Sequence, residues 1–270
     1  MDFSVFITAF GLTLFAGLST CLGSALAFFT KRTNKKLLSL SLGFSAGVML
    51  YVSFIEIFFQ AKESLSSGFG DFIGYCLTIM AFFGGIILIG FIDKLVPSYE
   101  NPHEIRMVEE ISKGGIKSKR RKKLLRVGFF VALAITIHNF PEGLVTFTAA
   151  LKDVTLGITL ALAIAIHNIP EGIAVSVPVF QATGSRKKAF IYSSISGLAE
   201  PLGALIGFVI LFPFLNDAVF GILFAAVAGI MVFISLDQLL PASREYGEHH
   251  MSVYGLFVGM VVMALGLLFL

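Results

Sequence analysis

ALAITIHNFPEGL, at residues 132–144, returns almost unchanged as ALAIAIHNIPEGI at residues 161–173. The copies differ only where Thr136, Phe140 and Leu144 of the first are replaced by Ala, Ile and Ile in the second. Each copy places His, Asn and Glu inside an apolar stretch long enough to cross a bilayer. Ionisable groups are costly to bury in such a stretch, so a repeated set of them indicates a functional site.

The composition around these copies is that of a membrane protein. Of 270 residues, 56% are hydrophobic and 14% charged, against about 25% charged in a soluble domain. Eight apolar runs have the length of a membrane-spanning helix, and lipid cannot satisfy an open backbone. We therefore predict an all-α fold, a polytopic membrane helix bundle of eight transmembrane helices forming a single domain, residues 1–270. The predicted spans are about 4–29, 37–59, 71–92, 126–150, 155–180, 188–213, 217–240 and 251–270.

Lysine and arginine set the predicted orientation. With the N-terminus outside, all of the 20 basic residues except Lys62 and Lys152 fall in inner loops or at inner helix ends, as the positive-inside rule requires. Asp2 precedes the first run and the positive charges follow it, which predicts an uncleaved span and not a secretory signal. Both termini are then extracytoplasmic. The loop 93–125, with Gly114–Gly115 and a basic cluster, is predicted to be mobile and cytoplasmic, either contacting anionic lipid or only fixing orientation.

The distribution of charge and cysteine disfavours nucleic-acid binding and a disulfide framework. The net charge of +3 is carried by loops between apolar runs, so it gives no support for binding nucleic acid. The two cysteines, Cys21 and Cys76, both lie inside apolar runs. We expect them to be free and to behave as small hydrophobic residues.

Helix geometry groups the polar residues of each copy. The His and Glu are four residues apart and share a face, with the Asn about 100° round the helix. Imidazole and carboxylate together suit Zn, Fe, Mn, Co or Ni. Glu200, in the middle of the span 188–213, is the one other carboxylate predicted at the midplane, and a metal or a proton must compensate for its burial. The predicted metal ligands are His138, Asn139, Glu142, His167, Asn168, Glu171 and Glu200.

The two copies lie on consecutive spans joined by a short outer loop at Lys152–Asp153, so the spans should be antiparallel. Equal motifs on antiparallel neighbours can be related by a two-fold axis in the membrane plane, as in transporters with inverted repeats. Pro141 and Pro170 remove a backbone N–H and should bend both helices there. The alternative is that the polar groups pair with one another and hold the helices together without any metal.

Other polar residues have weaker signals. Glu56, near the predicted outer end of its span, is either a point where metal enters or an ordinary interfacial carboxylate. Asp93 and Asp237 mark an exit or, as we favour, simply face inner water at helix ends. His249–His250 is a candidate for weak capture of a departing metal.

At the motifs HNFPEG (138–143), HNIPEGIAV (167–175) and SGLAEPLG (196–203), the chain resembles the ZIP (Zrt-, Irt-like protein) family of metal transporters. The resemblance implies a binuclear site. One metal position would use His138, Glu142, His167 and Glu171, and the second Asn139, Asn168 and Glu200 with Glu142 and Glu171 bridging. It also implies uptake of Zn²⁺, and of Fe²⁺, Mn²⁺ or Co²⁺, as substrates with no separate cofactor. A homodimer in the cell membrane, in bacteria the cytoplasmic membrane, is what the family suggests. The inner loop lacks the His-rich tract of many eukaryotic relatives, which argues against metal sensing by that loop.

The sequence thus predicts a divalent transition-metal transporter and not an enzyme. An intramembrane metalloenzyme is the first alternative, but the HExxH signature is missing and the E-x-x-H motif of di-iron bundles is absent from these spans. A proton or sodium carrier using Glu142, Glu171 and Glu200 is the second. It accounts for the carboxylates but not for the duplicated histidines.

Overall fold

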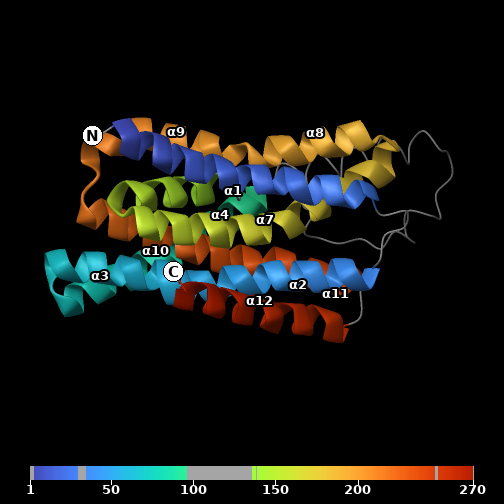
Figure 1. Cartoon of the computed structure of the whole chain (residues 1–270). Helices are drawn as coiled ribbons and strands as arrows, with labels where there is room; N and C mark the ends of the chain where they lie inside the picture. The colour runs from blue at the N-terminus through green and yellow to red at the C-terminus, as the bar shows by residue number, and fades with distance from the viewer. Residues whose placement is uncertain (1–2, 30–34, 96–135, 138, 247–248, 270) are drawn as a thin grey trace.

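The computed structural model describes residues 3–29, 35–95, 136–137, 139–246 and 249–269, and within these ranges all regular structure is helical (Figure 1). Seven of the described helical segments are long and apolar enough to cross a membrane, which confirms a polytopic helical bundle. The predicted span 126–150 begins outside the described residues, and its described part continues as helix 139–152. The loop 93–125 also lies almost wholly outside them.

The helices follow one another in the order of the predicted spans, with several subdivided. They are α1 (Phe3–Phe29), α2 (Lys35–Val52), the π-helical turn η1 (Ser53–Ile57), α3 (Phe58–Phe69), α4 (Asp71–Leu95), helix 139–152, α7 (Val154–Thr183), α8 (Arg186–Gly197), α9 (Ala199–Leu211), the 3-10 turn η2 (Phe212–Phe214), α10 (Asp217–Ile234), the π-helical turn η3 (Ser235–Leu239), α11 (Leu240–Tyr246) and α12 (His249–Phe269).

The second predicted span, 37–59, ends too early. Helical structure runs without a break from α2 through η1 and α3 to Phe69. The added segment is polar in sequence, yet Ala61, Ser64 and Leu65 are buried where α3 packs on α4 and α10. Hydropathy alone does not detect such a helix, because its apolar residues occupy one face only. Gly70, at φ 79°, then permits the sharp turn into α4.

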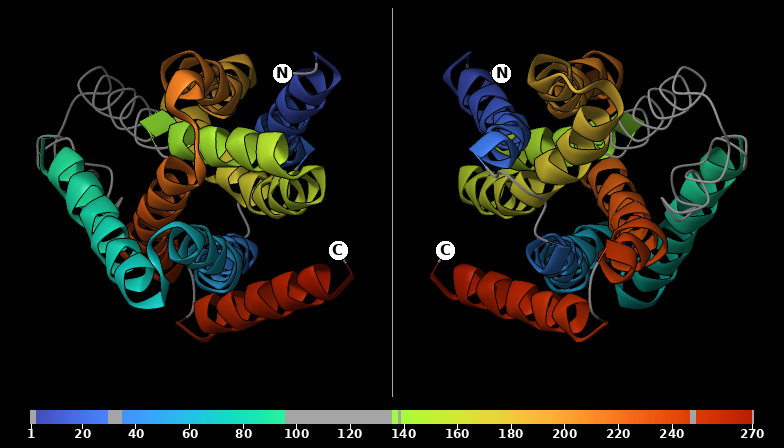
Figure 2. Two further views of the ribbon diagram at one scale, coloured as in Figure 1. Left: turned by 90° about the vertical axis from the view of Figure 1, so that its left-hand side faces the viewer. Right: turned by 90° about the vertical axis from the view of Figure 1, so that its right-hand side faces the viewer.

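The helices pack as two groups, seen end-on in Figure 2. The motif bundle contains α1, helix 139–152, α7, α8 and α9. The frame bundle contains α2, α3, α4, α10, α11 and α12. At the seam between the bundles, α2 packs along α7, and α12 also contacts α7.

The seam has an apolar core. Val145 and Ile164 of the motif bundle belong to the same buried cluster as Val48, Met49 and Phe224 of the frame bundle. All five side chains are fully buried. Close packing of apolar side chains therefore holds the bundles together, and few directional bonds cross the seam among the described residues.

Glycines allow α2 and α12 to meet at backbone distance. A Cβ at Gly43 or Gly47 would collide with the carbonyl oxygens of Ser252 or Leu256 in α12. Gly255 of α12 makes the reciprocal approach to α2. Small residues with this spacing are typical of tightly packed membrane helices, which have no hydrophobic driving force between them in lipid.

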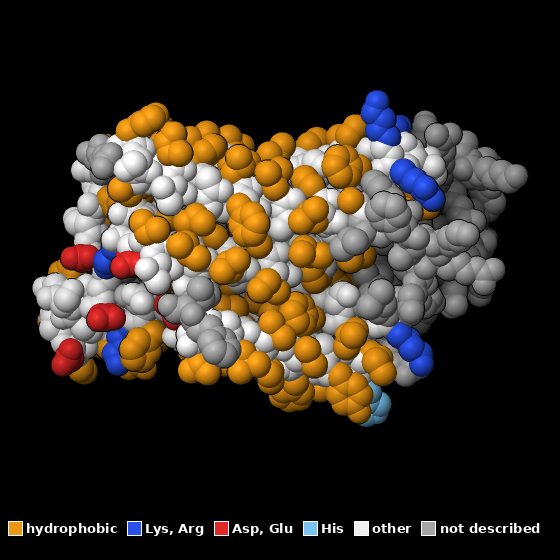
Figure 3. Space-filling model, viewed as in Figure 1, with side chains coloured by type: hydrophobic (Ala, Val, Ile, Leu, Met, Phe, Trp, Pro, Cys, Tyr) orange, Lys and Arg blue, Asp and Glu red, His pale blue; other side chains and the backbone are white. Residues whose placement is uncertain are grey.

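The outer surface fits a membrane protein. Hydrophobic side chains cover the middle of the face drawn in Figure 3, and charged side chains lie at its ends. Large apolar side chains such as Phe72 (82% exposed) and Val209 (75% exposed) point away from the protein. In water such a surface would aggregate, so these faces fit a lipid environment.

Candidate metal site

Helix α7 carries the second copy of the repeated motif near its middle. Asp153 caps its N-terminus by accepting a hydrogen bond from the Leu156 N–H at 3.0 Å, which satisfies one of the free donors of the first turn. The helix continues through Pro170 to Thr183. His167, Asn168 and Glu171 are all buried, so three polar side chains of one helix lie inside the protein.

Helix 139–152 carries the first copy and forms a hairpin with α7 around Asp153. A Cβ at Gly157 would meet Ala150, just across the turn, and Glu142 contacts His167 further along. Both pairs bracket Asp153, so the two helices are antiparallel, as predicted. Asn139 and Glu142 are fully buried.

The predicted span 188–213 is interrupted at Leu198, which separates α8 from α9. Pro201 has no N–H to donate to the carbonyl of Gly197, which weakens the hydrogen-bond ladder at this point. The Asn139 side-chain amide donates to the carbonyl oxygen of Ser196, beside the break, at 3.1 Å. Glu200 follows in the first turn of α9 and is fully buried. The interruption therefore brings a third helix segment to the site.

Glycine lets these segments approach closely. A Cβ at Gly143 would collide with the backbone of Glu200. One at Gly172 would collide with the Thr20 carbonyl in α1. Each glycine follows the glutamate of its motif, so the closest helix contacts lie beside the acidic side chains.

The His167 ring joins the two motifs. Its Nδ1 lies 3.1 Å from the carbonyl oxygen of Ala163, and its Nε2 lies 3.2 Å from Oε1 of Glu142. A carbonyl can only accept, so Nδ1 carries the proton of that hydrogen bond. In the neutral ring, Nε2 then presents a lone pair toward the carboxylate, which is the form that binds a metal. A cation, or a proton, between these two atoms would satisfy both.

Asn168 and Glu200 form the second contact of the site. The Asn168 side-chain amide donates to the carbonyl of Ala16 at 2.9 Å and to Oε1 of Glu200. No described residue donates a hydrogen bond to Asn168 Oδ1, Asn139 Oδ1 or Glu200 Oε2. Buried acceptors without a donor are rare and costly. These oxygens are therefore available to a cation.

Among the predicted ligands, the structure shows two direct contacts, His167 with Glu142 and Asn168 with Glu200. Asn139 and Glu171 are also buried. His138 lies outside the described residues. Within the described part of the chain, no three His, Cys, Asp or Glu side chains are arranged to hold a metal ion together. The site in this structure thus consists of two pairs, His167 with Glu142 and Asn168 with Glu200, and of buried side-chain oxygens that accept no hydrogen bond from a described residue.

Two neighbours of the site carry no signal in the sequence. Ser45 of α2 donates its hydroxyl to the His167 carbonyl at 3.2 Å, across the seam. Ala16 of α1 contributes only its carbonyl oxygen. A serine or an alanine in an apolar run gives no indication of such a role.

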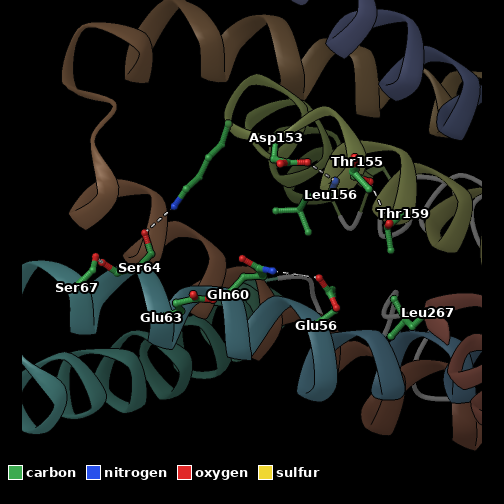
Figure 4. A pocket seen from close by; sticks show the side chains of 11 residues that line it. Glu56, Gln60, Glu63, Ser64, Ser67, Asp153, Thr155, Leu156, Thr159 and Leu267 are labelled. Atoms are coloured by element: carbon green, nitrogen blue, oxygen red, sulfur yellow. Dashed lines mark hydrogen bonds between the residues drawn. The ribbon is translucent and has the colours of Figure 1, made fainter. Parts of the chain in front are cut away.

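The weaker candidates lie elsewhere. Glu56 sits in the π-helical turn η1, well before the end of the helix at Phe69, and lines a pocket of about 730 Å³ with Gln60 and Asp153 (Figure 4). Asp237 is exposed within the second π-helical turn, η3. Local π-helical turns inside helices are frequent at functional sites. His250 is exposed and stacks on Tyr254.

Comparisons with known proteins agree with the resemblance seen in the motifs. A family model described as ZIP zinc transporter matches residues 103–266. The chain is similar to proteins named zinc transporter ZupT. It is 61% identical to that of Oceanobacillus iheyensis over 264 residues, covering 98% of each chain. It is 60% identical to that of Lysinibacillus sphaericus over 271 residues, covering 100% of each, and 60% identical to that of Streptococcus mutans over 261 residues, covering 97% of each.

The matches to these relatives cover nearly the whole chain, and the family model covers residues 103–266, which include the helices that bury the repeated His, Asn and Glu. Together with the helices long enough to cross a bilayer, they give a multi-pass protein of the cell membrane. The chain belongs to the ZIP zinc transporter family.

Proposed function

We propose that this protein carries Zn²⁺ across the cell membrane into the cytoplasm, with Fe²⁺, Mn²⁺ and Co²⁺ as further substrates. The observation that carries the proposal is the buried contact between His167 and Glu142, beside Asn168 and Glu200. Nitrogen and oxygen donors of this kind suit divalent transition metals. The relatives named zinc transporter support zinc as the first substrate.

The proposed site lies halfway across the membrane and holds two metal ions. Its ligands are His138, Asn139, Glu142, His167, Asn168, Glu171 and Glu200, with Glu142 and Glu171 bridging. The open acceptor oxygens of both asparagines and of Glu200 support this assignment. Three carboxylates in a water-free interior need compensating positive charge, and the cations supply it.

The proposed topology has eight spans, both termini outside, and the loop 93–125 in the cytoplasm, all within one domain of residues 1–270. Lys187 and Lys188 at the start of α8 are exposed, as are Glu63 of α3 and Asp71 at the start of α4. Helices α8 and α3 lie toward opposite ends of the molecule in Figure 1. A basic inner end is what the positive-inside rule requires. A homodimer and direct contact with anionic lipid are part of the same proposal.

The proposed mechanism is alternating access, in which the motif bundle moves against the frame bundle. The seam between the bundles is mainly apolar and is crossed by α2 against α7. The pocket lined by Glu56 ends at Thr159, eight residues before His167, or about 12 Å of helix rise. His167 is fully buried, so the site is closed to this pocket here. Sliding at an apolar seam breaks few directional bonds and would open the site.

Zinc flux into vesicles tests the proposal. The purified protein is reconstituted with a zinc-sensitive dye inside, and uptake is measured with and without competing Fe²⁺, Mn²⁺ or Co²⁺. We expect uptake by the wild type and background flux for Glu171→Ala. Thr78→Val, a buried polar position on α4 far from the motifs, is the matched control and should keep wild-type flux. Wild-type flux equal to that of empty vesicles would refute transport. Turnover of a lipid or peptide without zinc flux would favour an intramembrane metalloenzyme. Sodium or proton flux without zinc flux would favour a proton or sodium carrier.

A further inference from the structure

Lys152 is a single basic side chain that ties the two bundles together. It is the last residue of helix 139–152, in the motif bundle. Its ammonium lies 3.0 Å from Oδ1 of Asp217 and donates to the Ser64 hydroxyl at 3.0 Å. It also stands over the Phe220 ring, 4.1 Å from the centroid. All three partners belong to the frame bundle.

The partners of Lys152 are themselves fixed in place. The Ser64 hydroxyl donates to the backbone carbonyl of Asp217 at 2.9 Å, which joins α3 to α10. Asn216 caps α10 by accepting from the Val219 N–H at 2.9 Å. An acceptor, a carboxylate and an aromatic face are thus held around one ammonium. The ion pair is partly exposed, at 37% for the Lys152 side chain and 66% for that of Asp217, so the hydroxyl and ring contacts add to what would otherwise be a weak surface pair.

The position of Lys152 connects it to access of the pocket. Lys152 lines the same pocket as Glu56, and Leu156 and Thr159 of α7 form the part nearest to the site (Figure 4). The next residue, Asp153, is the cap of α7. Lys152 is therefore attached to both motif helices through one residue, and it moves whenever they move.

We propose that Lys152 is a latch that holds the outer end of the seam closed, and that its release accompanies opening of the site to the outside. The proposal rests on the alternating access described above. An interaction present in only one of two states stabilises that state by its full strength. Loss of the latch therefore shifts the protein toward the outward-open state.

Lys62 provides a matched comparison at the same end of the molecule. Its ammonium lies over the rings of Phe59 and Tyr75, at 5.7 and 5.1 Å from their centroids. Both rings belong to α3 and α4, in the frame bundle that also carries Lys62. Removing this lysine takes away an equal charge and similar ring contacts without touching the seam.

Labelling of a pocket cysteine tests the latch. Thr159→Cys is placed in a chain whose Cys21 and Cys76 are changed to Ser, and its reaction with a membrane-impermeant thiol reagent is timed in vesicles with the outer face exposed. We expect labelling about fivefold faster in Lys152→Met, from the loss of one ion pair and one cation–π contact. The KM for external zinc should fall in the same variant. Lys152→Arg and the exchange Lys152→Asp with Asp217→Lys should return both values toward wild type, and Lys62→Met should change neither.

Two results would overturn the latch: an unchanged labelling rate in Lys152→Met, or an equal increase in Lys62→Met. The outcome also separates the latch from the proposed function. Zinc flux with unchanged labelling would remove the latch and leave transport standing. Faster labelling of Lys152→Met in a protein that carries no zinc would refute the transport proposal. Lys152 would then still be a contact that closes the pocket.

Discussion

The motif bundle and the frame bundle differ most at their midpoints. In the motif bundle, α7 and helix 139–152 bury His167, Glu142 and their polar neighbours. Beside them in the frame bundle, α2 and α10 bury Val48 and Phe224. Both bundles consist of apolar helices of membrane-spanning length. Hydropathy therefore does not separate them, whereas the buried polar groups mark the bundle to which we assign the proposed metal site.

Both bundles use glycine to bring helices to backbone distance, with different consequences. Gly47 of α2 packs on the α12 backbone, among apolar residues. Gly143 packs on the backbone of Glu200, a proposed ligand. Glycine contacts thus hold α2 against α12 in the frame bundle, and in the motif bundle they position Glu200, a proposed metal ligand.

The largest difference should come from replacing one buried side chain in each bundle. His167→Leu removes a proposed ligand, and we expect zinc uptake to fall by about 100-fold or more, since even residues that support ligands contribute about 10- to 100-fold. The change also takes this partner away from the buried Glu142 carboxyl, so we expect a lower free energy of unfolding as well. Met231→Leu in α10 is the corresponding change in the frame bundle. Its zinc uptake should stay within about twofold of the wild type, since Met and Leu have similar volume. Vesicle flux and thermal unfolding in detergent measure both. Equal losses in the two variants would remove the distinction between the bundles.

The next largest effect is expected at the two glycine contacts. Gly143→Ala and Gly47→Ala should each destabilise the fold by about 1–3 kcal/mol, because the added Cβ overpacks a backbone contact. Only Gly143→Ala should also weaken zinc binding, because it displaces Glu200. Thermal unfolding and calorimetric zinc titration separate the two properties. Weaker zinc binding in Gly47→Ala would show that the frame bundle also shapes the site.

A several-fold effect is expected at the helix interruption before Glu200. Pro201→Ala restores an N–H and lets α8 run on into α9. Glu200 would then turn relative to Asn168, and uptake should fall several-fold while the helix becomes more stable. Pro241→Ala in α11 is the matched change in the frame bundle and should leave uptake near wild type. Hydrogen exchange at residues 198–203 reports the break. Restored exchange protection with full uptake would mean that the break has no role in transport.

The smallest effect is expected from the serine that crosses the seam. Ser45→Ala removes the hydrogen bond to the His167 carbonyl, worth about 0.5–1.5 kcal/mol. It should change the uptake rate by only about twofold, which corresponds to the lower end of this range, and leave zinc affinity unaltered. Ser243→Ala removes a comparable bond from Ser243 to the Ser39 carbonyl inside the frame bundle and should change neither. Concentration dependence of the flux gives rate and affinity together. A change of zinc affinity in Ser45→Ala would mean that this hydrogen bond across the seam also positions the metal ligands.

Much of this architecture was predictable from local patterns. The apolar runs predicted helices, and most described helices lie where expected. The second continues to Phe69, the run 188–213 is interrupted at Leu198, and the run 217–240 continues to Tyr246. The hairpin at Asp153 followed from two motifs with a short polar link. The count of eight spans, the orientation of the termini and the role of His138 stay predictions.

The partners inside the site were less accessible to sequence reasoning. Helix periodicity placed His167 on one face with Glu171, but the contact in the structure runs across the hairpin to Glu142. The break at Leu198 has a local signal in Pro201, which lacks an N–H, although the apolar run predicted one uninterrupted span over 188–213. Ser45 and Lys152 gave no such signal, because their partners lie far away along the chain.

The sequence by itself determined that the chain forms apolar helices and that polar groups recur at matched points along two of them, because hydropathy and i, i+4 spacing are properties of short segments. Only the tertiary structure decided which side chains meet and which helices pack into the same bundle. Those contacts depend on how closely and at what angle helices pack, and Gly143 and Gly47 fix that at points far apart in the sequence.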